Sequence, residues 1–436
     1  MRTRPILILP FLFLLSLHAV PVCVAQQVVD PSLIVTTWLS GVPSVSGMAF
    51  LPGTDDAFVI QRNTGRVFHV HDQQIAGTAL DLKVANAGSQ GLLGIALHPD
   101  FGNNGFVYLS YTAAPKDGGK AIANRIERYR WDGTRLLFDK TIQVLPAANG
   151  SQNVGGKIAF AQDGKLYGVI GDLDLRQRTQ NRVDSKSTSL TSVIVRLNDD
   201  GSPPADNPFF LSGNPAATMR RIYAYGVRDS RGLAIDPLTG RLWATETGPG
   251  QYDEINLVRP GFNSGWERLM GPKSRNGFAG GPLVLLGSAA KYADPKFSWR
   301  TSIVPTDLEF DGDGGLGAGY AGDLFVASAG GTIYRFRLNA ARDDLLLSGA
   351  LADRVADNQS DPLHSQQSAI LFGSGFGPAA DIIDGPRGIY VVDPSGGKIY
   401  EISPIPEPAG LLAGCMAIML LAARAARRRR RFVTRP

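Results

Sequence analysis

The stretch NVGGKIAFAQDGKLYGVIGD, residues 153–172, is predicted to form two β-strands joined by a tight turn. Apolar residues dominate IAF and LYGVI, and the Asp-Gly pair between them is typical of a turn. Further units of this kind recur along the chain, so that hairpins begin near Met48, Ile95, Ile158, Leu233, Leu308 and Ile382. A hairpin cannot bury its own faces, and units recurring at intervals of 47 to 75 residues without helical periodicity indicate blades around an axis. The sequence therefore predicts an all-β, six-bladed propeller, a single domain over residues 30–405.

The composition agrees with this architecture. The chain of 436 residues is 44% hydrophobic and 19% charged, with 51 glycines and 28 prolines, so it can bury a large core while turning often. No strong helical pattern interrupts residues 30–405, and no linker marks a second domain. The apolar segment LIVTTWLSG, residues 33–41, is expected to add a closing strand to the last blade, because an unpaired edge there would invite aggregation.

The two ends of the chain have the pattern of targeting segments. Arg2 and Arg4 precede an apolar run and small residues up to Ala25, which is the order of a secretory signal peptide over residues 1–25. Residues 406–436 begin with Pro-Glu-Pro, continue with an apolar span at 409–423 and end in an arginine cluster. This tail resembles the PEP-CTERM sorting signal, which implies an exosortase-type processing enzyme as a partner. A plain C-terminal membrane anchor is the alternative, although the apolar span is short of the roughly 20 residues that a helix needs to cross a bilayer.

These two segments distort the net charge of the chain. Without residues 1–25 and 406–436, Lys+Arg falls from 44 to 35 and Asp+Glu from 39 to 38, so the formal charge changes from +5 to −3. Without an excess of positive charge, the composition gives no argument for nucleic-acid binding. Both cysteines also lie in these segments, so the processed chain has neither disulfides nor thiolate chemistry. We expect an exported protein in the periplasm, at the cell surface or in the extracellular matrix, attached to the membrane at least transiently.

Several local motifs lack the context that their chemistry needs. Residues 317–322 match G-x-G-x-x-G, but an apolar strand follows them and not a helix, so a dinucleotide site is not expected. Residues 311–314 resemble part of a calcium loop without its closing glutamate, and a hairpin turn explains them better. His69 and His71 could share a metal on one strand face, although exposed or hydrogen-bonded histidines are the simpler interpretation. The G-x-S-x-G elbow of a serine hydrolase does not occur.

Longer phrases carry a family resemblance. These are GLLGIALHPDFGNNGFVYLSYT (91–112), the opening stretch at 153–172, YGVRDSRGLAIDPLTGRLWATETGPGQYDEINLVRPGFNSGW (225–266) and GGTIYRFRL (330–338). They resemble the soluble pyrroloquinoline quinone (PQQ)-dependent glucose, aldose and sorbosone dehydrogenases over nearly all of residues 35–403. The resemblance implies a six-bladed propeller with PQQ and calcium on its axis. It also implies that a histidine accepts the proton of a sugar's anomeric hydroxyl while hydride passes from C1 to the quinone.

The catalytic pattern of the family is only partly present. Asn153 stands where the family has its catalytic histidine, whereas Asp172 matches the aspartate that orients it. Arg228 matches a cofactor-binding arginine, and Asp229 replaces the asparagine that usually follows it. Gly248 and Pro249 match the pair whose backbone carbonyls bind calcium, while Asp253 and Glu254 match an acidic pair that could be structural.

The cations that hold the quinone in the family are also missing. Residues 326–334, which correspond to the segment with its lysine, contain no lysine, and residues 377–381 lack its two arginines. Because the quinone carries three carboxylates, this loss predicts weak binding in the family's manner. An asparagine amide stays neutral, so Asn153 can orient a hydroxyl but cannot deprotonate it.

Two functions remain open on the sequence alone. One is an exported sugar dehydrogenase that uses PQQ and calcium in an altered site, with Asp172 or Asp229 as the base. The other is a non-catalytic propeller that binds a sugar or an exopolysaccharide.

Overall fold

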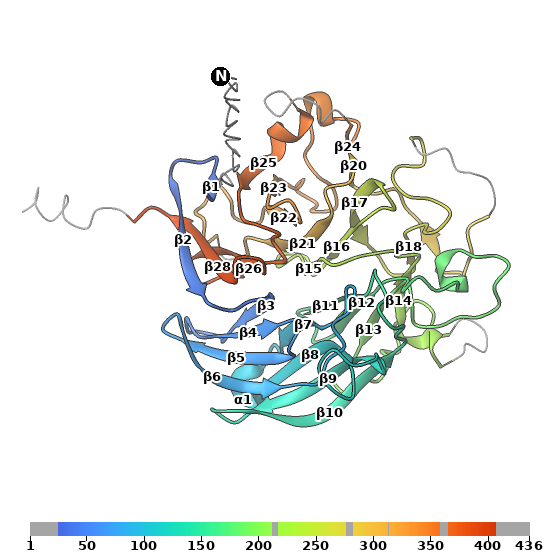
Figure 1. Cartoon of the computed structure of the whole chain (residues 1–436). Helices are drawn as coiled ribbons and strands as arrows, with labels where there is room; N and C mark the ends of the chain where they lie inside the picture. The colour runs from blue at the N-terminus through green and yellow to red at the C-terminus, as the bar shows by residue number, and fades with distance from the viewer. Residues whose placement is uncertain (1–24, 212–216, 276–281, 313, 358–364, 407–436) are drawn as a thin grey trace, which may run out of the picture.

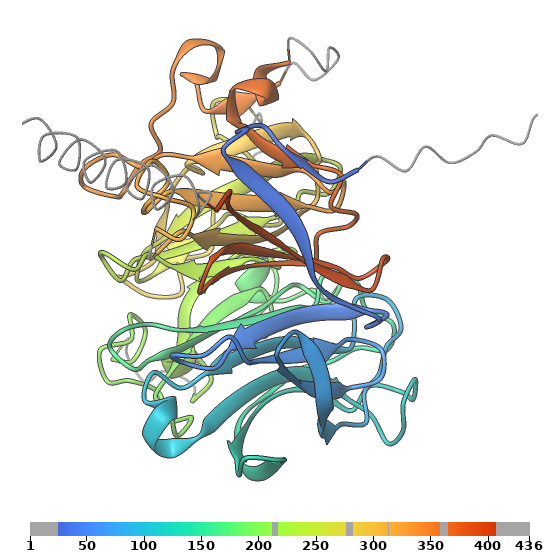
Figure 2. The same ribbon diagram turned by 90° about the vertical axis from the view of Figure 1, so that its left-hand side faces the viewer.

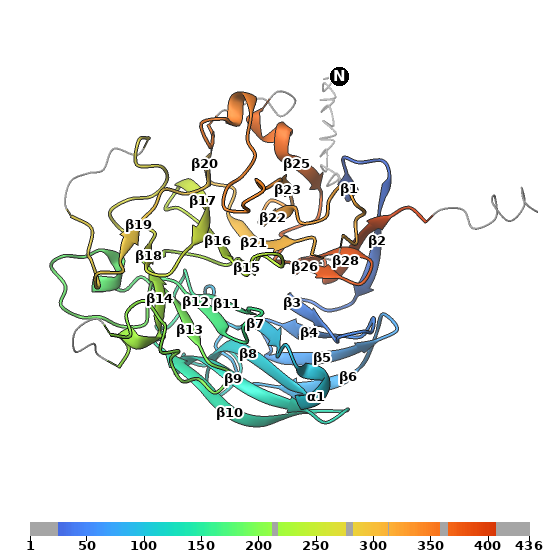
Figure 3. The same cartoon turned by 180° about the vertical axis from the view of Figure 1, so that it is seen from behind.

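Six sheets surround a common axis in the computed structural model (Figure 1), which describes residues 25–211, 217–275, 282–312, 314–357 and 365–406. The innermost strands of the six sheets contact one another in a closed ring, in the order β3, β7, β11, β15, β21, β26 and back to β3. Figure 3 shows the same ring from behind, with these strands nearest the centre. The all-β propeller predicted from the hairpin repeats is therefore confirmed.

Three of the sheets begin one after another in the first half of the chain. The first consists of β3 (Val45–Phe50), β4 (Ala57–Gln61), β5 (Arg66–His71) and β6 (Gln74–Asp81). The second consists of β7 (Leu92–Leu97), β8 (Phe106–Ala113), β9 (Ala123–Trp131) and β10 (Leu136–Leu145). The third consists of β11 (Gly155–Phe160), β12 (Leu166–Ile170), β13 (Val193–Leu197), β14 (Ile222–Tyr225), β18 (Phe262–Asn263) and β19 (Lys291–Tyr292).

The other three sheets use the second half of the chain and its N-terminal part. The fourth consists of β15 (Leu233–Ile235), β16 (Leu242–Glu246), β17 (Gln251–Val258), β20 (Phe297–Thr301) and β24 (Val355–Ala356). The fifth consists of β21 (Pro305–Phe310), β22 (Leu324–Ser328), β23 (Ile333–Phe336), β25 (Leu371–Ser374) and β1 (Gln27–Val28). The sixth consists of β26 (Asp381–Gly385), β27 (Gly388–Asp393), β28 (Lys398–Pro404) and β2 (Leu33–Ser40).

Helical structure in the described residues is short. It comprises the helix α1 (Phe101–Asn104) and the 3₁₀ turns η1 (Arg178–Gln180), η2 (Met219–Arg221), η3 (Gly349–Leu351) and η4 (Gln366–Ile370). Among these residues, no helix has the length and hydrophobicity that would let it cross a membrane. The two predicted targeting segments lie outside the described residues, apart from Ala25 and Pro406.

Each predicted hairpin forms the two inner strands of a different sheet. The hairpin at 153–172, for example, forms β11 and β12, which pair antiparallel and are joined by a turn at Asp163 and Gly164. The predicted closing strand is also confirmed, because β2 pairs antiparallel with β28 over the length of both strands. Figure 2 shows this N-terminal strand, in blue, lying beside the red C-terminal strands. Hydrogen bonds between the two ends of the chain thus complete the last sheet.

The sheets pack face to face through apolar side chains. Trp243, Trp299 and Tyr390 are fully buried. Trp299 of β20 packs edge to face against Phe297 of the same strand and against Phe336 of β23 in the fifth sheet. Burial of large aromatic surfaces of this kind is the main favourable contribution to folding. Buried charged groups also lie at the axis, where the inner strands meet.

An ammonium group links three inner strands across the axis. Lys157 of β11 donates to Asp307 of β21 at 2.7 Å and also to Asp381 of β26. The second oxygen of Asp381 accepts a hydrogen bond from the backbone N–H of Met48 in β3 at 3.2 Å. Burial acts to lower the pKa of Lys157, but the two carboxylates outweigh it and raise that pKa, so the group stays charged.

Replacing Lys157 should destabilise the protein strongly. Lys157→Met leaves two carboxylates facing each other on the axis, and loss of one partner from a buried ion pair costs about 3–5 kcal/mol. We expect a clear fall in the thermal unfolding temperature and in the urea midpoint. Lys140→Met is the matched control, because Lys140 is exposed on β10 and should change neither value measurably. Equal stability of Lys157→Met and the unaltered protein would contradict the role given to this ammonium group.

Candidate functional site

Asn153, which the sequence analysis predicts to stand where the catalytic histidine would be, is hydrogen-bonded to Asp172. Asn153 Nδ2 donates to Asp172 Oδ1 at 3.0 Å, and Trp266 Nε1 donates to Asp172 Oδ2 at 2.8 Å. The backbone N–H of Asp174 also donates to Asp172 Oδ1, at 3.0 Å. Asn153 and Asp172 are only 4% and 5% exposed. Burial raises the pKa of Asp172, although these donors oppose the effect.

A glycine permits this close arrangement. A Cβ atom at Gly171 would lie 2.0 Å from the Asn153 carbonyl oxygen and 2.4 Å from that of Arg228. The Arg228 carbonyl also accepts a hydrogen bond from the backbone N–H of Asp172 at 2.9 Å. The glycine before Asp172 in the phrase VIGD therefore allows two backbone segments to converge at this point.

The guanidinium group of Arg228 lies against the predicted calcium loop. Arg228 Nη1 donates to the carbonyl oxygens of Thr247 and Gly248 at 3.0 and 3.3 Å. Calcium accepts backbone carbonyl oxygens as ligands, and these two carbonyls converge on one positive group. The same convergence is compatible with binding of a metal cation. In the described residues, no cluster of three or more His, Cys, Asp or Glu side chains suits a metal ion. Pro249, the other predicted ligand, is exposed.

Asp229 has a partner that the sequence analysis missed. Arg231 Nε and Nη2 donate to the two carboxylate oxygens of Asp229 at 3.3 and 3.0 Å. Asp229 is 3% exposed, and its backbone carbonyl accepts from the N–H of Thr247 at 2.8 Å. A carboxylate at this position therefore fits the arginine two residues later, within the same phrase YGVRDSRG.

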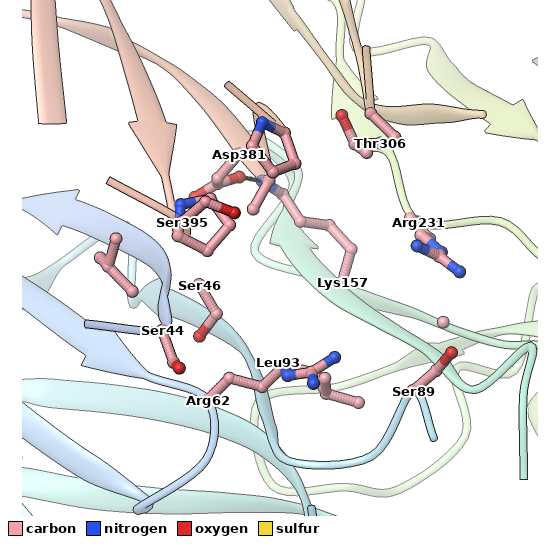
Figure 4. A pocket seen from close by; sticks show the side chains of 16 residues that line it. Ser44, Ser46, Arg62, Ser89, Leu93, Lys157, Arg231, Thr306, Asp381 and Ser395 are labelled. Carbon is pink, nitrogen blue, oxygen red and sulfur yellow. Dashed lines mark hydrogen bonds and ion pairs between the residues drawn. The ribbon is translucent and has the colours of Figure 1, made fainter. Parts of the chain in front are cut away.

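A cavity of about 520 Å³ lies where the six sheets meet (Figure 4). Every sheet, or the loop that adjoins it, contributes to its wall. The lining residues are Ser44, Val45, Ser46, Arg62, Ser89, Leu93, Gly155, Lys157, Arg231, Thr306, Ala329, Pro378, Ala380, Asp381, Pro394 and Ser395. Its volume falls in the usual range for sites that bind small molecules.

The predicted site residues lie together, but beside this cavity. Asn153, Asp172, Arg228, Asp229 and Gly248 are joined through the hydrogen bonds described above and those of Thr247. Neither these five nor Pro249 is among the sixteen lining residues. Their neighbours Gly155 and Arg231 do line the cavity and connect the two regions.

The charged groups inside the cavity were not found by sequence reasoning. Lys157 stands within the opening stretch NVGGKIAF, and Arg231 within YGVRDSRG, so both were in view. Arg62 follows β4 in the phrase VIQRNTGR. Strand alternation assigns a side chain to one face of a sheet, but it does not show which strand ends face the axis. A search for lysine and arginine within or next to the predicted strands could have drawn attention to Lys157, Arg62 and Arg231.

Comparison with known proteins decides the family. The model of the family described as "Glucose / Sorbosone dehydrogenase" matches residues 43–362. The chain belongs to this family. Within it, the chain is 33% identical over 254 residues to quinoprotein glucose dehydrogenase B of Acinetobacter calcoaceticus, an alignment that covers 53% of this chain and 52% of that protein. The chain therefore spans about half the length of that relative.

Two further similarities within the glucose/sorbosone dehydrogenase family cover more of the chain. Aldose sugar dehydrogenase YliI of Escherichia coli is 27% identical over 371 residues, which is 82% of this chain and 89% of that protein. The solved PQQ-bound form of an aldose sugar dehydrogenase from Streptomyces coelicolor is 26% identical with a TM-score of 0.58, covering 86% of this chain and 99% of that chain. These similarities support a sugar dehydrogenase-like propeller protein.

The carboxyl group of Glu309 should make stability depend on pH. Burial raises the pKa of Glu309 on β21 to about 8, while Lys157 opposes the shift. The folded state thus binds this proton more tightly than the unfolded state, whose glutamate titrates near 4.3. The free energy of unfolding therefore falls as the pH rises from the unfolded-state pKa of Glu309 toward its folded-state pKa of about 8, because unfolding in this range releases the proton.

Glu309→Gln removes this titration. We expect the fall in unfolding free energy between pH 5 and pH 8 to become smaller than in the unaltered protein, by about 3 to 4 kcal/mol. Urea unfolding at the two pH values measures the difference. An identical fall in the variant and the unaltered protein would show that Glu309 does not hold its proton in the folded state.

Proposed function

We propose that this protein is an exported quinoprotein sugar dehydrogenase that oxidises an aldose or a related sugar at its anomeric carbon with PQQ and calcium. The observation that carries the proposal is the axial cavity, because it lies at the centre of the propeller and two arginines line it. The quinoprotein named above and the PQQ-bound relative support the choice of cofactor.

The cavity coincides with the segments that bind the quinone by family resemblance. Ala329 belongs to residues 326–334, and Pro378 and Ala380 belong to residues 377–381, and all three line the cavity. The family's cations are missing at these positions, but Arg62 and Arg231 supply positive charge from other parts of the wall. The residues present therefore fit a ligand with carboxylate groups, held by arginines at different positions.

The calcium ion would be held by the backbone carbonyls of Gly248 and Pro249. The Gly248 carbonyl already faces the positive charge of Arg228, so a calcium ion would compete with that guanidinium group. When bound, PQQ would supply a hydride acceptor and calcium would supply a Lewis acid.

Asp172 is the residue that we assign as proton acceptor. Asn153 uses its amide N–H₂ on Asp172, which leaves its carbonyl oxygen to accept a hydrogen bond from a sugar hydroxyl. The amide cannot take the proton itself, whereas the adjacent carboxylate can. Burial raises the pKa of Asp172 toward the range in which a carboxylate works as a general base.

Binding and turnover of the purified protein test this proposal. Calorimetry with PQQ, in the presence and absence of calcium, should show binding that calcium strengthens, and a dye-linked assay with aldoses should show oxidation. Asp172→Asn should keep PQQ binding but reduce kcat by about 10²–10⁴-fold, which is the usual contribution of a positioned base. Asn153→Ala leaves the Asp172 carboxylate in place, so it should reduce kcat less than Asp172→Asn does.

Two outcomes would contradict the proposal. If the protein binds sugars or polysaccharide but neither binds PQQ nor oxidises aldoses, it is a binding protein on the dehydrogenase scaffold. If Asp172→Asn keeps full turnover, the assignment of the proton acceptor is wrong even though the enzyme is of this type.

The proposal of export has its own support in the fold. The first described strand, β1, begins at Gln27, and Gln26 Nε2 donates to the Gly375 carbonyl at 3.0 Å. The last described strand ends at Pro404, just before the Pro-Glu-Pro of the proposed sorting signal. The strands therefore fill the interval between the two proposed processing sites.

Mass spectrometry of the protein secreted by an exporting host tests the processing. We expect an N-terminus at Gln26 and, in cells that contain an exosortase-type enzyme, a C-terminus near Pro406. An exported protein that keeps residues 1–25 would contradict the signal peptide. A tail that remains intact beside an active exosortase-type enzyme would favour the plain membrane anchor.

A further inference from the structure

Arg62 and Arg231 approach the axial cavity from different sheets. Arg62 follows β4 and Arg231 precedes β15, and both side chains project toward the cavity in Figure 4. The stem of Arg62 lies against Gly91, where a Cβ atom would come within 2.4 Å of Arg62 Cγ. Gly91 also has a φ of 144°, which other residues rarely adopt. The local backbone therefore leaves room for a large cation at this position.

Arg62 has no carboxylate partner among the described residues. Its Nε donates to the side-chain oxygen of Asn63 at 3.1 Å, and no ion pair of Arg62 occurs in the part of the chain that the structure describes. Burial lowers the pKa of Arg62, and the charge of Arg231 lowers it further. The two positive charges thus repel each other across a partly buried space, and Arg62 has no carboxylate beside it among the described residues that would offset this repulsion.

The other cations of the cavity differ from Arg62 in how far they are neutralised. Lys157 is held by two carboxylates, and Arg231 is held by Asp229 through Nε and Nη2. The bonds with Asp229 fix the plane of the Arg231 guanidinium group. Among these three cations, Arg62 is therefore the one whose charge no carboxylate of the described residues offsets, and Arg231 keeps its Nη1 outside the bonds with Asp229.

We propose that Arg62 and Arg231 form a carboxylate clamp that holds an anionic group of the ligand in the axial cavity, with Asp229 as the residue that positions Arg231. This inference rests on the function proposed above for the same cavity. Guanidinium groups suit planar carboxylates because they offer parallel N–H donors. The carboxylate belongs either to the quinone or to an acidic sugar such as a uronate, and the two sources bind at the same pair of arginines.

The clamp also accounts for two departures from the family pattern. Asp229, where the family usually has asparagine, supplies the charge that orients Arg231. Ala329, Pro378 and Ala380 line the cavity without any cation, and the clamp replaces the charge that they do not provide.

Calorimetry on the full chain tests the clamp with three ligands: PQQ with calcium, glucuronate, and glucose as the neutral control. Arg62→Gln and Arg231→Gln should each weaken the binding of any carboxylate ligand that the unaltered protein binds by about 10–100-fold, while binding of glucose should change less than threefold. Asp229→Asn should cause a smaller loss. Arg130→Gln is the matched control, because Arg130 is exposed on β9, away from the cavity. Thermal unfolding of each variant shows that it is folded.

The three ligands separate the possible results. Loss of PQQ affinity alone assigns the carboxylate to the quinone, and loss of glucuronate affinity alone assigns it to an acidic sugar. If the unaltered protein does not bind PQQ but binds glucuronate through the two arginines, the clamp stands and the proposed oxidation fails. If PQQ or glucuronate binds with the same affinity to both arginine variants, or if neither ligand binds, the clamp is wrong, whether or not the protein oxidises sugars.

Discussion

The ion pairs of Lys157 with Asp307 and Asp381 are the constraint on which the centre of this propeller depends. Six inner strands that converge on one axis bring their side chains into a small space, and there the polar groups must find partners. One ammonium group satisfies carboxylates from two other blades, and Asp381 extends the link to the backbone of β3. Lys157 and Asp381 also line the cavity, so the interaction that joins the blades shapes the site.

The rest of the site is organised by hydrogen bonds and ion pairs around residues that the resemblance predicts to differ from their counterparts in the family. Asn153, which the resemblance places where the family has a histidine, donates a hydrogen bond to Asp172. Asp229 stands in the position of an asparagine and binds Arg231. The neutral residues at Ala329 and Ala380 face a cavity whose positive groups come from elsewhere in the wall.

The hairpins of the fold could be predicted because each one is a local pattern of apolar strands and a turn. The closing strand could be predicted because an exposed edge at residues 33–41 would be unfavourable. The short parallel pairings of β14 with β18 and of β18 with β19 could not, because they join segments far apart in sequence and leave no periodicity. At the site, the family phrase predicted that Asn153 and Asp172 belong to one region but not the hydrogen bond between them, and the place of Arg62 depends on packing against Gly91.

The central claim is that the axial cavity, with its two arginines, is where this protein binds its cofactor. A crystal structure of the protein grown with PQQ and calcium tests that claim most directly. We predict electron density for the tricyclic quinone inside the cavity, with a carboxylate within hydrogen-bond distance of Arg62 or Arg231. Quinone density elsewhere on the propeller, or a cavity that contains only water in crystals saturated with PQQ, would contradict the claim.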